Sequence, residues 1–399
     1  MITVGKLNIF VAGLHAHNER VGRYVMKAKN WLKFISISFI LMISADSFSR
    51  GPPPGKGGGG GEVSVDHKAK QVRPIELGTS GGNVTDSANG YCCSGTLGSL
   101  ITVGSSQYIL SNAHVFKGDI TSSGSNDGIN QPGLIDNQCS APDADIVAKL
   151  YSWSDLSDSS QDVNVDAAIA VVIDGEVNKE GRILEIGTIS STTVKPYLDQ
   201  PVKKSGRTSG LTHGTVKALD ATVNVGYSYE CAGDNFTKAF TGQILVSPGK
   251  FIKGGDSGSL MVEDKADNPG AVGLLFAGSK RIAVANPIDD VLAFFGGDMV
   301  GGSATQASTT STSSSKAPGQ PFQASEVAKA SLAKRVHGSR LLTIPEAVGH
   351  AVGKSNSHAN RIVIKVLVEK ITGDTIRATP KTIDGIHVEL WEVGKITAY

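Results

Sequence analysis

Three short segments carry residues whose types and order suit nucleophilic catalysis. His114 lies at the end of the apolar segment LSNAHV, Asp166 opens the apolar segment NVDAAIAVV, and Ser257 lies in the glycine-rich segment KGGDSGSL. A serine hydroxyl is a poor nucleophile unless a base takes its proton during attack. A neutral imidazole is a suitable base when a carboxylate holds its second nitrogen. We therefore interpret Ser257 as the nucleophile, His114 as the general base and Asp166 as the group that orients it.

The glycines around the serine have a role in the same chemistry. They allow a tight turn whose amide groups point inward, so we expect the N–H groups of Gly255 and Ser257 to stabilise an oxyanion. Asp162 and Asp174 are alternatives to Asp166 for the carboxylate. We expect both alternatives in loops, whereas Asp166 alone opens an apolar strand.

The chain has four cysteines, Cys92, Cys93, Cys139 and Cys231. A disulfide between the adjacent pair would be strained, because neighbouring Cα atoms lie closer than disulfide geometry requires. Cys139 and Cys231 are therefore expected to bridge to Cys92 and Cys93, in either order. An even number of cysteines is typical of exported proteins, whereas free buried thiols would argue against export.

The N-terminal region has the pattern of an export signal. Lysines precede the apolar stretch Phe34–Ala45, which is too short to span a bilayer. We expect residues 1–45 to be a signal peptide, with Met26 as an alternative start, and the protein to be secreted or periplasmic with no stable membrane span after its removal. A buried helix or an uncleaved anchor are the alternatives. Lys and Arg number 38 against 37 Asp and Glu, so no basic field indicates nucleic-acid binding.

Composition divides the rest of the chain into four parts. Residues 46–70 form a Gly/Pro-rich linker and residues 301–322 a Ser/Thr-rich linker, because neither segment has the apolar residues that a core needs. The predicted catalytic domain lies between them, at 71–300. A small α+β accessory module is expected at 323–399.

Short apolar runs bounded by turn-forming residues predict an all-β body. The strands expected are 95–103 and 107–115 as a hairpin, then 165–173, 215–227, 240–246, 258–262, 271–279 and 281–288. Asp289 and Asp290 suit the start of a short helix that closes the body. In the accessory module we expect a helix from Ser325 to about Val336, with Val327, Leu332 and Val336 on one side. Strands are expected at 361–369 and 386–393, with a turn at Asp384-Gly385.

These motifs together resemble the bacterial branch of the trypsin-like serine peptidases. The resemblance is carried by SGTLGSLI, YILSNAHVF, KSGRTSGLTHGTV, GGDSGSLMV and AVANPIDDVLAFF, and it spans about 73–297. It implies two six-stranded antiparallel β-barrels with a short C-terminal helix and an active site between the barrels. It also implies catalytic roles for His114, Asp166 and Ser257 and oxyanion roles for Gly255 and Ser257. The expected function is a secreted serine endopeptidase that acts on a protein or peptide substrate through an acyl-enzyme.

The sequence departs from the family pattern in two places. Asp256 matches the aspartate that pairs with a freed N-terminus in zymogen-derived members, but the nearest candidate activation site, VRPIELG, has Pro74 inside it. We therefore expect local hydrogen bonds to hold Asp256. Phe251 stands at the base of the expected specificity pocket, with its wall at 276–278 (Phe276, Ala277 and Gly278). Such a pocket favours small or apolar side chains.

Other interpretations remain open. A catalytically silent binding or scaffold protein that keeps the peptidase fold is the main alternative, because an activation signal is missing and an extra module is present. The module is similar to one that accompanies related bacterial peptidases. Four roles are open for it: an inhibitory segment for intramolecular regulation, a chaperone-like pro-segment, a docking module or a structural appendage. We expect no cofactor, and no metal site because the histidines lack ligand spacing. Lys203, Lys204 and Arg207 are expected on a solvated face.

Overall fold

The structure is a computed structural model that describes residues 65–119, 127–157, 163–231, 233, 235–303, 324–358 and 361–398. The predicted signal peptide and most of both predicted linkers lie outside these residues. In the ranges described, no helix has the length and apolar content needed to cross a bilayer.

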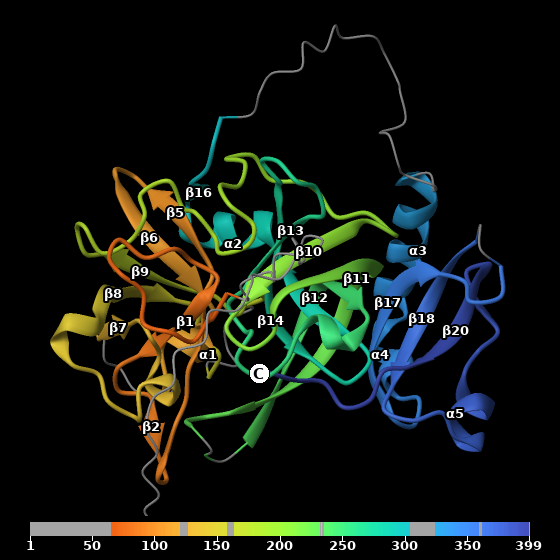
Figure 1. Cartoon of the computed structure of the whole chain (residues 1–399). Coiled ribbons are helices and arrows are strands. Elements are labelled where there is room, and N and C mark those ends of the chain that lie inside the picture. The colour runs from red at the N-terminus through yellow and green to blue at the C-terminus, as the bar shows by residue number, and fades with distance from the viewer. Residues whose placement is uncertain are drawn as a thin grey trace, which may run out of the picture. The chain divides into compact units, whose positions relative to one another are not determined.

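The first barrel is an antiparallel ring of strands (Figure 1). Its strands are β1 (Thr79–Asn83), β4 (Gly95–Leu97), β5 (Ser99–Val103), β6 (Ser106–Ser111), β7 (Gly128–Asn130), β8 (Ile146–Trp153) and β9 (Ala168–Val172). The pairing order is β5-β6-β9-β8-β7-β1-β4. Only Gly98 separates β4 from β5, so the two act as one bent strand that closes a six-stranded barrel. The short β16 (Asp298–Met299) pairs with the outer side of β5, and β2 (Ser87–Ala88) and β3 (Tyr91–Cys92) form a separate hairpin.

The second barrel is also six-stranded and closed. Its strands are β10 (Pro201–Gly206), β11 (Gly210–Ser228), β12 (Asn235–Ser247), β13 (Leu260–Glu263), β14 (Ala271–Gly278) and β15 (Ala283–Pro287). They pair in the order β10-β13-β14-β15-β12-β11, and β10 also pairs with β11, which closes the ring. Helix α2 (Ile288–Phe295) follows, with two aspartates in its first turn and Gly296 in the left-handed conformation at its end. The predicted all-β class with two six-stranded barrels and a short closing helix is confirmed.

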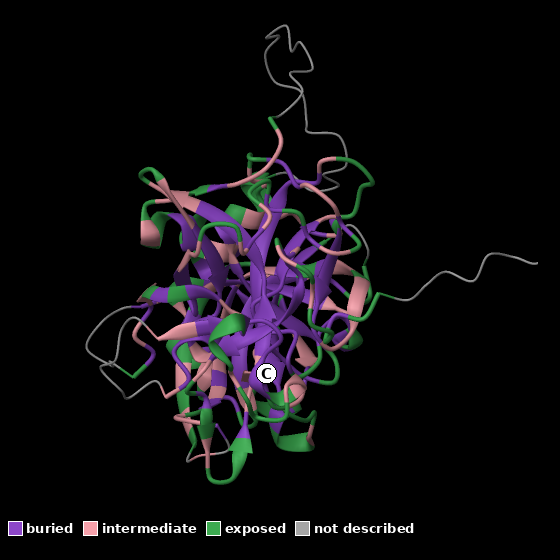
Figure 2. Cartoon of the chain, turned by 60° about the vertical axis from the view of Figure 1, so that its left-hand side comes forward, coloured by how far each residue is buried: buried purple, intermediate pink, exposed green. Residues whose placement is uncertain are grey.

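Alternation along the strands decides which side chains reach the core. In β11 the buried positions include Val223, Val225 and Tyr227, two residues apart, as expected of a strand with one face in a core. β14 is buried along its whole length because neighbours cover both of its faces. The largest hydrophobic cluster contains residues of both barrels, so the barrels pack against each other through common apolar residues, and a separate cluster fills the second barrel (Figure 2).

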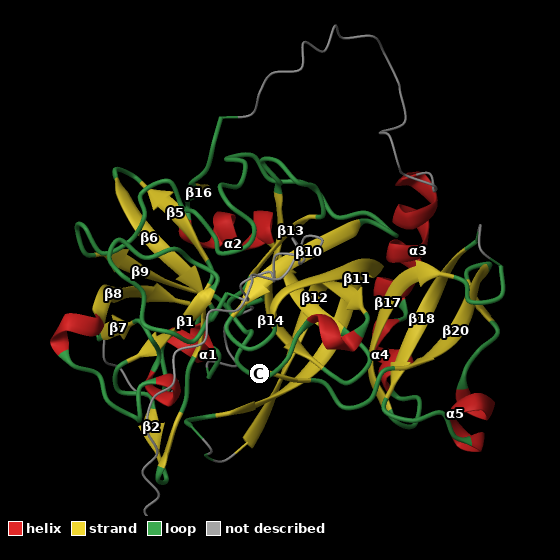
Figure 3. Cartoon of the chain, in the orientation of Figure 1, coloured by secondary structure: helices red, strands yellow, loops and turns green. Residues whose placement is uncertain are grey.

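The C-terminal part is α+β, as predicted (Figure 3). Its elements are α3 (Ala324–Val336), α4 (Gly338–Leu342), β17 (Ala347–Lys354), β18 (Ile362–Val368), α5 (Gly373–Ala378), β19 (Thr382–Ile383), β20 (Ile386–Glu392) and β21 (Thr397–Ala398). β17 pairs antiparallel with β11, so the sheet of the second barrel continues into the module. The predicted turn at Asp384 and Gly385 is present, with both residues at positive φ.

The predicted apolar side of α3 is wrong for two of its three residues, because only Val327 packs against a hydrophobic cluster. Leu332 and Val336 are each 65% exposed, and the helix instead packs through Ala330, Ala333 and Lys334. Small side chains let the helix lie close to β17 and β18, and the Lys334 ammonium reaches Asp220. Only the stem of this lysine is apolar, so hydrophobic periodicity did not reveal the contact face.

The structure resolves the cysteine pairing that the sequence left open. Cys92 bonds to Cys139, and Cys93 bonds to Cys231. The first bridge stays within the first barrel's loops. The second joins the β2–β3 hairpin to the turn between β11 and β12, and so links the two barrels covalently.

We predict that Gly98→Ala destabilises the protein by about 2 kcal/mol or more and lowers activity, because overpacking forces the backbone to move. A Cβ at this position would stand 1.9 Å from the carbonyl oxygen of Gly258, next to the candidate nucleophile. Gly82→Ala is the control, because its Cβ would meet neighbours at 3.4 Å and beyond. Chemical denaturation measures the loss, and equal stability of the two variants would contradict the prediction.

Candidate active site

His114 and Asp166 are brought together by neighbouring strands of the first barrel. His114 lies in the single-turn helix α1 (Ala113–Phe116) that follows β6, and Asp166 lies just before β9. β6 pairs with β9, with Ser111 opposite Ala168. The Nδ1 atom of His114 therefore stands 2.6 Å from Oδ2 of Asp166. The geometry matches what is required of a base and the carboxylate that fixes its tautomer.

The Asp166 carboxylate is fully buried and has several donors. The backbone N–H groups of Ala113 and His114 donate to Oδ1 at 2.8 and 3.3 Å. The hydroxyl of Tyr227 donates to Oδ2 at 3.0 Å. Burial, and secondarily the charge of Asp166, raises the pKa of Tyr227 well above its usual value, so this phenol stays protonated and remains a donor. Together these donors stabilise the negative charge of Asp166, which would be unfavourable in a buried position without hydrogen bonds.

Sequence reasoning missed two groups that the second barrel adds to this site. Besides Tyr227 of β11, the side chain of Asn286 in β15 bonds the backbone on both sides, accepting from Asp166 N–H at 3.2 Å and donating to its carbonyl at 3.3 Å. Each of these two residues is a polar residue within an apolar strand. One sequence alone does not show whether such a residue belongs to a site or only faces solvent.

Ser257 lies in the turn before β13, fully buried, and its Oγ donates to the carbonyl of Phe276 at 3.2 Å. The turn is pressed against the first barrel, because Thr96 N–H donates to the Ser257 carbonyl at 2.9 Å. Gly258 has φ +92°, and a Cβ there would come within 2.1 Å of the Ser111 hydroxyl. Only glycine fits this position, so the glycine-rich motif allows the serine turn to approach the strand that leads to His114.

The candidate oxyanion amides belong to a turn whose carbonyl groups accept hydrogen bonds from side chains of other segments. The Thr208 hydroxyl donates to the Gly254 carbonyl at 2.6 Å, and the Thr96 hydroxyl donates to the Gly255 carbonyl at 2.9 Å. A trans peptide points its N–H away from its C=O, so the first bond directs the Gly255 N–H away from Thr208. Within the described residues, the amides of Gly255 and Ser257 have no hydrogen-bond acceptor.

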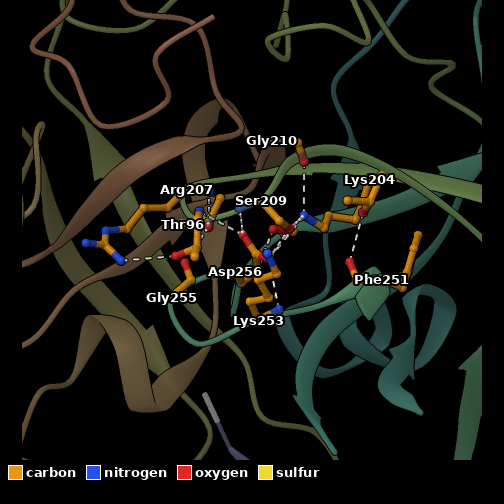
Figure 4. Close-up of polar contacts among 12 residues, drawn as sticks. Thr96, Lys204, Arg207, Ser209, Gly210, Phe251, Lys253, Gly255 and Asp256 are labelled. Carbon is orange, nitrogen blue, oxygen red and sulfur yellow. Dashed lines mark hydrogen bonds and ion pairs between the residues drawn. The ribbon is translucent and has the colours of Figure 1, made fainter. Parts of the chain in front are cut away.

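Asp256 stands between these two amides and is buried with its own cation (Figure 4). Its carboxylate accepts backbone N–H groups from Thr208 at 2.8 Å, Ser209 at 3.0 Å and Lys253 at 2.9 Å. The ammonium of Lys204 lies 3.2 Å from Oδ2. Burial lowers the pKa of Lys204, and the charge of Asp256 opposes that shift. The expectation that local hydrogen bonds hold Asp256 is confirmed, with a lysine as the counter-ion.

The prediction that Lys203, Lys204 and Arg207 form a solvated face is wrong, because all three are buried. Lys203 donates to the carbonyl of Lys265 at 2.7 Å. The guanidinium of Arg207 binds both oxygens of Asp136 in the first barrel. The two lysines of β10, and Arg207 directly after it, therefore face internal acceptors. Most of these acceptors lie far along the chain, so the sequence could not show them.

A cleft of about 340 Å³ runs beside these groups. Its lining includes His114, Gly254 and Gly255 with Arg207 and Tyr227. None of the four predicted pocket residues is among the described lining: Phe251, Phe276, Ala277 and Gly278 are all buried. Phe251 packs in the core of the second barrel with residues such as Val216 and Met261.

A second carboxyl group, Asp86, also lines this cleft. Burial raises its pKa to about 7, and the charge of His114 opposes the shift. Asp86 lies within 4.8 Å of the sulfurs of Cys93 and Cys231, an arrangement that resembles a metal-ligand cluster. These two sulfurs are joined in a disulfide, so neither is a thiolate that could bind a metal.

Comparisons with known proteins give distant similarities. No protein-family model matches the sequence, and no curated protein matches it. A solved structure described as a glutamic acid specific serine protease with a novel histidine triad in substrate binding is 20% identical over 56% of this chain and 100% of its own, with a TM-score of 0.37. Protease A of Thermobifida fusca is 17% identical over 57% of this chain and 99% of its own, with a TM-score of 0.37. Chymotrypsin of Cellulomonas bogoriensis is 15% identical over 57% and 99%, with a TM-score of 0.36.

We predict that Lys204→Met destabilises the protein by about 3 kcal/mol, because the buried Asp256 carboxylate loses its cation. The double variant Lys204→Met/Asp256→Asn should recover part of this loss, since it removes the unpaired charge as well. Urea denaturation of the single and double variants measures both effects. A single variant as stable as the parent would show that the backbone donors alone suffice.

We predict that Asp86→Asn changes the pH dependence of stability. Because the pKa of Asp86 rises from 3.8 to about 7 on folding, the folded protein holds a proton that the unfolded chain releases between these values. The free energy of unfolding therefore falls as pH rises from about 4 to about 7. The asparagine variant should lack this loss, which is on the order of 2–4 kcal/mol. The free energy of unfolding of the variant, relative to that of the parent, should therefore be higher at pH 8 than at pH 4.

Thermal unfolding across pH 4 to 8 tests this expectation, with the exposed Asp143→Asn as the matched control. The control should follow the parent at every pH. A constant difference between Asp86→Asn and the parent across the range would contradict the assignment.

Proposed function

We propose that the protein is a secreted serine endopeptidase that hydrolyses peptide bonds through an acyl-enzyme on Ser257. The observation that carries the proposal is the 2.6 Å contact between His114 Nδ1 and a fully buried Asp166 carboxylate, in a cleft next to the serine turn. A buried carboxylate with this many donors is a costly feature that a barrel core does not need.

The proposed mechanism assigns one step to each of these groups. His114, fixed in one tautomer by Asp166, takes the proton of the Ser257 hydroxyl as the oxygen attacks the substrate carbonyl. Asp166 stabilises the imidazolium that results. The amides of Gly255 and Ser257 stabilise the oxyanion of the tetrahedral intermediate. The imidazolium then gives its proton to the leaving amine, and water releases the acyl group by the same steps in reverse order.

The Asp256–Lys204 pair has a positioning role in this proposal. Trypsin-like activation needs a cation that holds the aspartate before the serine, so that the oxyanion amides keep their direction. Lys204 supplies an internal ammonium at 3.2 Å. The proposed enzyme therefore forms its oxyanion turn without cleavage of an activation peptide.

An extracellular or periplasmic location agrees with the two disulfides, which form and persist in oxidising compartments. We include secretion in the proposal on this ground together with the signal-like segment at the N-terminus.

A catalytically silent binding protein is the second candidate. The observation in its favour is that Ser257 is fully buried and its hydroxyl is donated to the Phe276 carbonyl. Such a protein would keep the cleft for recognition and never acylate its serine. Reactivity of the serine separates the two candidates.

The test is reaction with a fluorophosphonate probe, together with cleavage mapping on a peptide library. The parent protein should be labelled on Ser257 and should cleave peptides, and Ser257→Ala should lose both activities by a factor of at least about 1000. Ser105→Ala, an exposed serine in the β5–β6 turn, is the matched control and should behave as the parent. Labelling that persists in Ser257→Ala would refute the nucleophile, and a parent that is never labelled or active would favour the silent protein.

A further inference from the structure

The disulfide between Cys93 and Cys231 forms part of the wall of the cleft that contains His114. It joins the residue after β3 to the turn between β11 and β12, and these two segments lie next to each other (Figure 1). A disulfide carries no charge and has no polar hydrogen to donate. It is therefore a poor partner for a carboxylate that lies beside it.

Asp86 is such a carboxylate, and it is buried without a partner of its own. The residue is 5% exposed and lines the same cleft, and one of its oxygens stands within 4.8 Å of both sulfurs. Among the described residues, no group donates a hydrogen bond to this carboxylate and no cation pairs with it. Burial raises its pKa to about 7. A buried polar group that the chain itself leaves unsatisfied needs an explanation, and a ligand is one.

Glu230 adds a second negative charge to this part of the cleft. It directly precedes Cys231, and its Oε1 accepts the side-chain amide of Asn89 at 3.1 Å, a neutral donor that leaves the charge uncompensated. Within the described lining, the guanidinium of Arg207 is already bound by both oxygens of Asp136. The two carboxylates and the disulfide between them thus form an acidic recess with no counter-ion among the described residues.

The position of the acidic recess relative to His114 gives its place along a substrate. In the proposed mechanism His114 passes its proton to the leaving amine, so that amine must lie next to the imidazole. The wall of the cleft continues from His114 through Val115 to Gly118. A Cβ on Gly118 would stand 3.2 Å from the Cβ of Asp86. A substrate that continues along this wall beyond the attacked bond therefore passes Asp86.

We propose that the acidic recess binds the ammonium or guanidinium group of a lysine or arginine side chain on the leaving-group side of a peptide substrate. The inference rests on the proposed peptidase function for its place in a reaction, and it adds a side-chain preference to that function. The cation supplies the partner that Asp86 lacks, so binding offsets the unfavourable burial of an isolated charge.

The depth of Asp86 favours a cation at the end of an apolar stem. An inorganic ion would have to lose most of its water to reach a residue that is 5% exposed. The methylene groups of lysine and arginine can instead lie along the disulfide while the charged end reaches the carboxylate. A guanidinium is more weakly hydrated than an ammonium and matches a carboxylate with two parallel N–H groups. Arginine is therefore expected to bind more tightly than lysine.

Peptide binding tests the acidic recess without relying on turnover. In a Ser257→Ala background at pH 8, two fluorescent peptides are compared by anisotropy. One has the sequence Ala-Ala-Arg-Ala, and the other has citrulline, which has the shape of arginine without its charge, in place of the arginine. The arginine peptide should bind at least about tenfold more tightly, because hydrogen bonds between charged groups are the stronger kind. Equal affinities, or binding of neither peptide, would overturn the proposal.

Substitutions assign the preference to particular carboxylates. Asp86→Asn keeps the shape of the side chain and should reduce the preference to about twofold, the value expected of the half-buried Glu230 alone. Glu230→Gln should reduce it only in part. The exposed Asp143→Asn is the matched control and should keep the full preference. Thermal unfolding shows that each variant is folded, and a full preference in Asp86→Asn would contradict the assignment.

The pH dependence of binding identifies Asp86 a second time. Because the pKa of Asp86 is about 7, its charge increases as pH rises through that value, and the preference for the arginine peptide should increase with it. The other titratable groups in the described lining are His114, Glu230, Tyr227 and Arg207, and loss of a proton from His114 would act in the same direction. Asp86→Asn retains all four groups. An equal increase of the preference in both proteins would therefore overturn the role of Asp86.

Acyl transfer tests whether the recess lies on the leaving-group side. With Ser257 intact, a peptide ester acylates the serine, and argininamide or citrullinamide then competes with water for the acyl group. The α-amine forms the new amide bond as the serine ester bond breaks, and its proton passes through His114 to the Ser257 oxygen. Argininamide should capture at least about tenfold more acyl groups than citrullinamide, and Asp86→Asn should lose most of this difference.

The two experiments together separate this inference from the proposed function. If the Ser257→Ala protein prefers the arginine peptide but the Ser257 protein never releases a product, the recess stands and the peptidase function fails. If peptides are cleaved and both amides are captured equally, the peptidase function stands and the leaving-group preference fails. A preference in binding without one in capture would likewise overturn the placement on the leaving-group side.

Discussion

The arrangement of the two barrels depends on one buried carboxylate. Asp166 is fully buried, and an unpaired charge at this depth would destabilise the fold strongly. Its donors come from both barrels: the α1 backbone and His114 from the first, and the Tyr227 hydroxyl from the second. The barrels must dock in one orientation for this set of donors to be complete. The same requirement that stabilises the interface between the barrels therefore fixes the orientation of the His114 imidazole, the proposed general base.

A second buried carboxylate, Asp256, fixes the position of the serine turn. Asp256 is satisfied by the ammonium of Lys204 and by the backbone N–H groups of Thr208 and Lys253. These contacts are local to the second barrel, whereas Thr96 ties the same turn to the first barrel through its backbone and its hydroxyl. Ser257 and His114, the proposed nucleophile and base, are thus held by separate networks. The serine-turn network reaches the short strand β4 through Thr96, and Gly98 joins β4 to β5.

The sequence predicted what is encoded locally. Alternating apolar runs and turn-forming residues identified most strands of the body, and the motifs around His114, Asp166 and Ser257 identified residues that lie around one cleft and one turn. What it could not show depends on contacts between distant segments. Lys204 was expected in solvent because its partner Asp256 lies 52 positions further on. β17 was missed because AVGHAVGK has few large apolar residues, and its strand is stabilised by pairing with β11 and β18.

The long strand β11 connects these features into one physical unit. It pairs with β10 and β12 within the barrel, with β17 of the module, and with β21 at Gly226. The next residue along β11 is Tyr227, which holds Asp166. The N–H of Gly226 donates to the carbonyl of Ile396, the residue before β21, at 3.0 Å. The last described segment of the chain, the module strand β17 and the phenol that donates to Asp166 therefore all depend on the path of one strand.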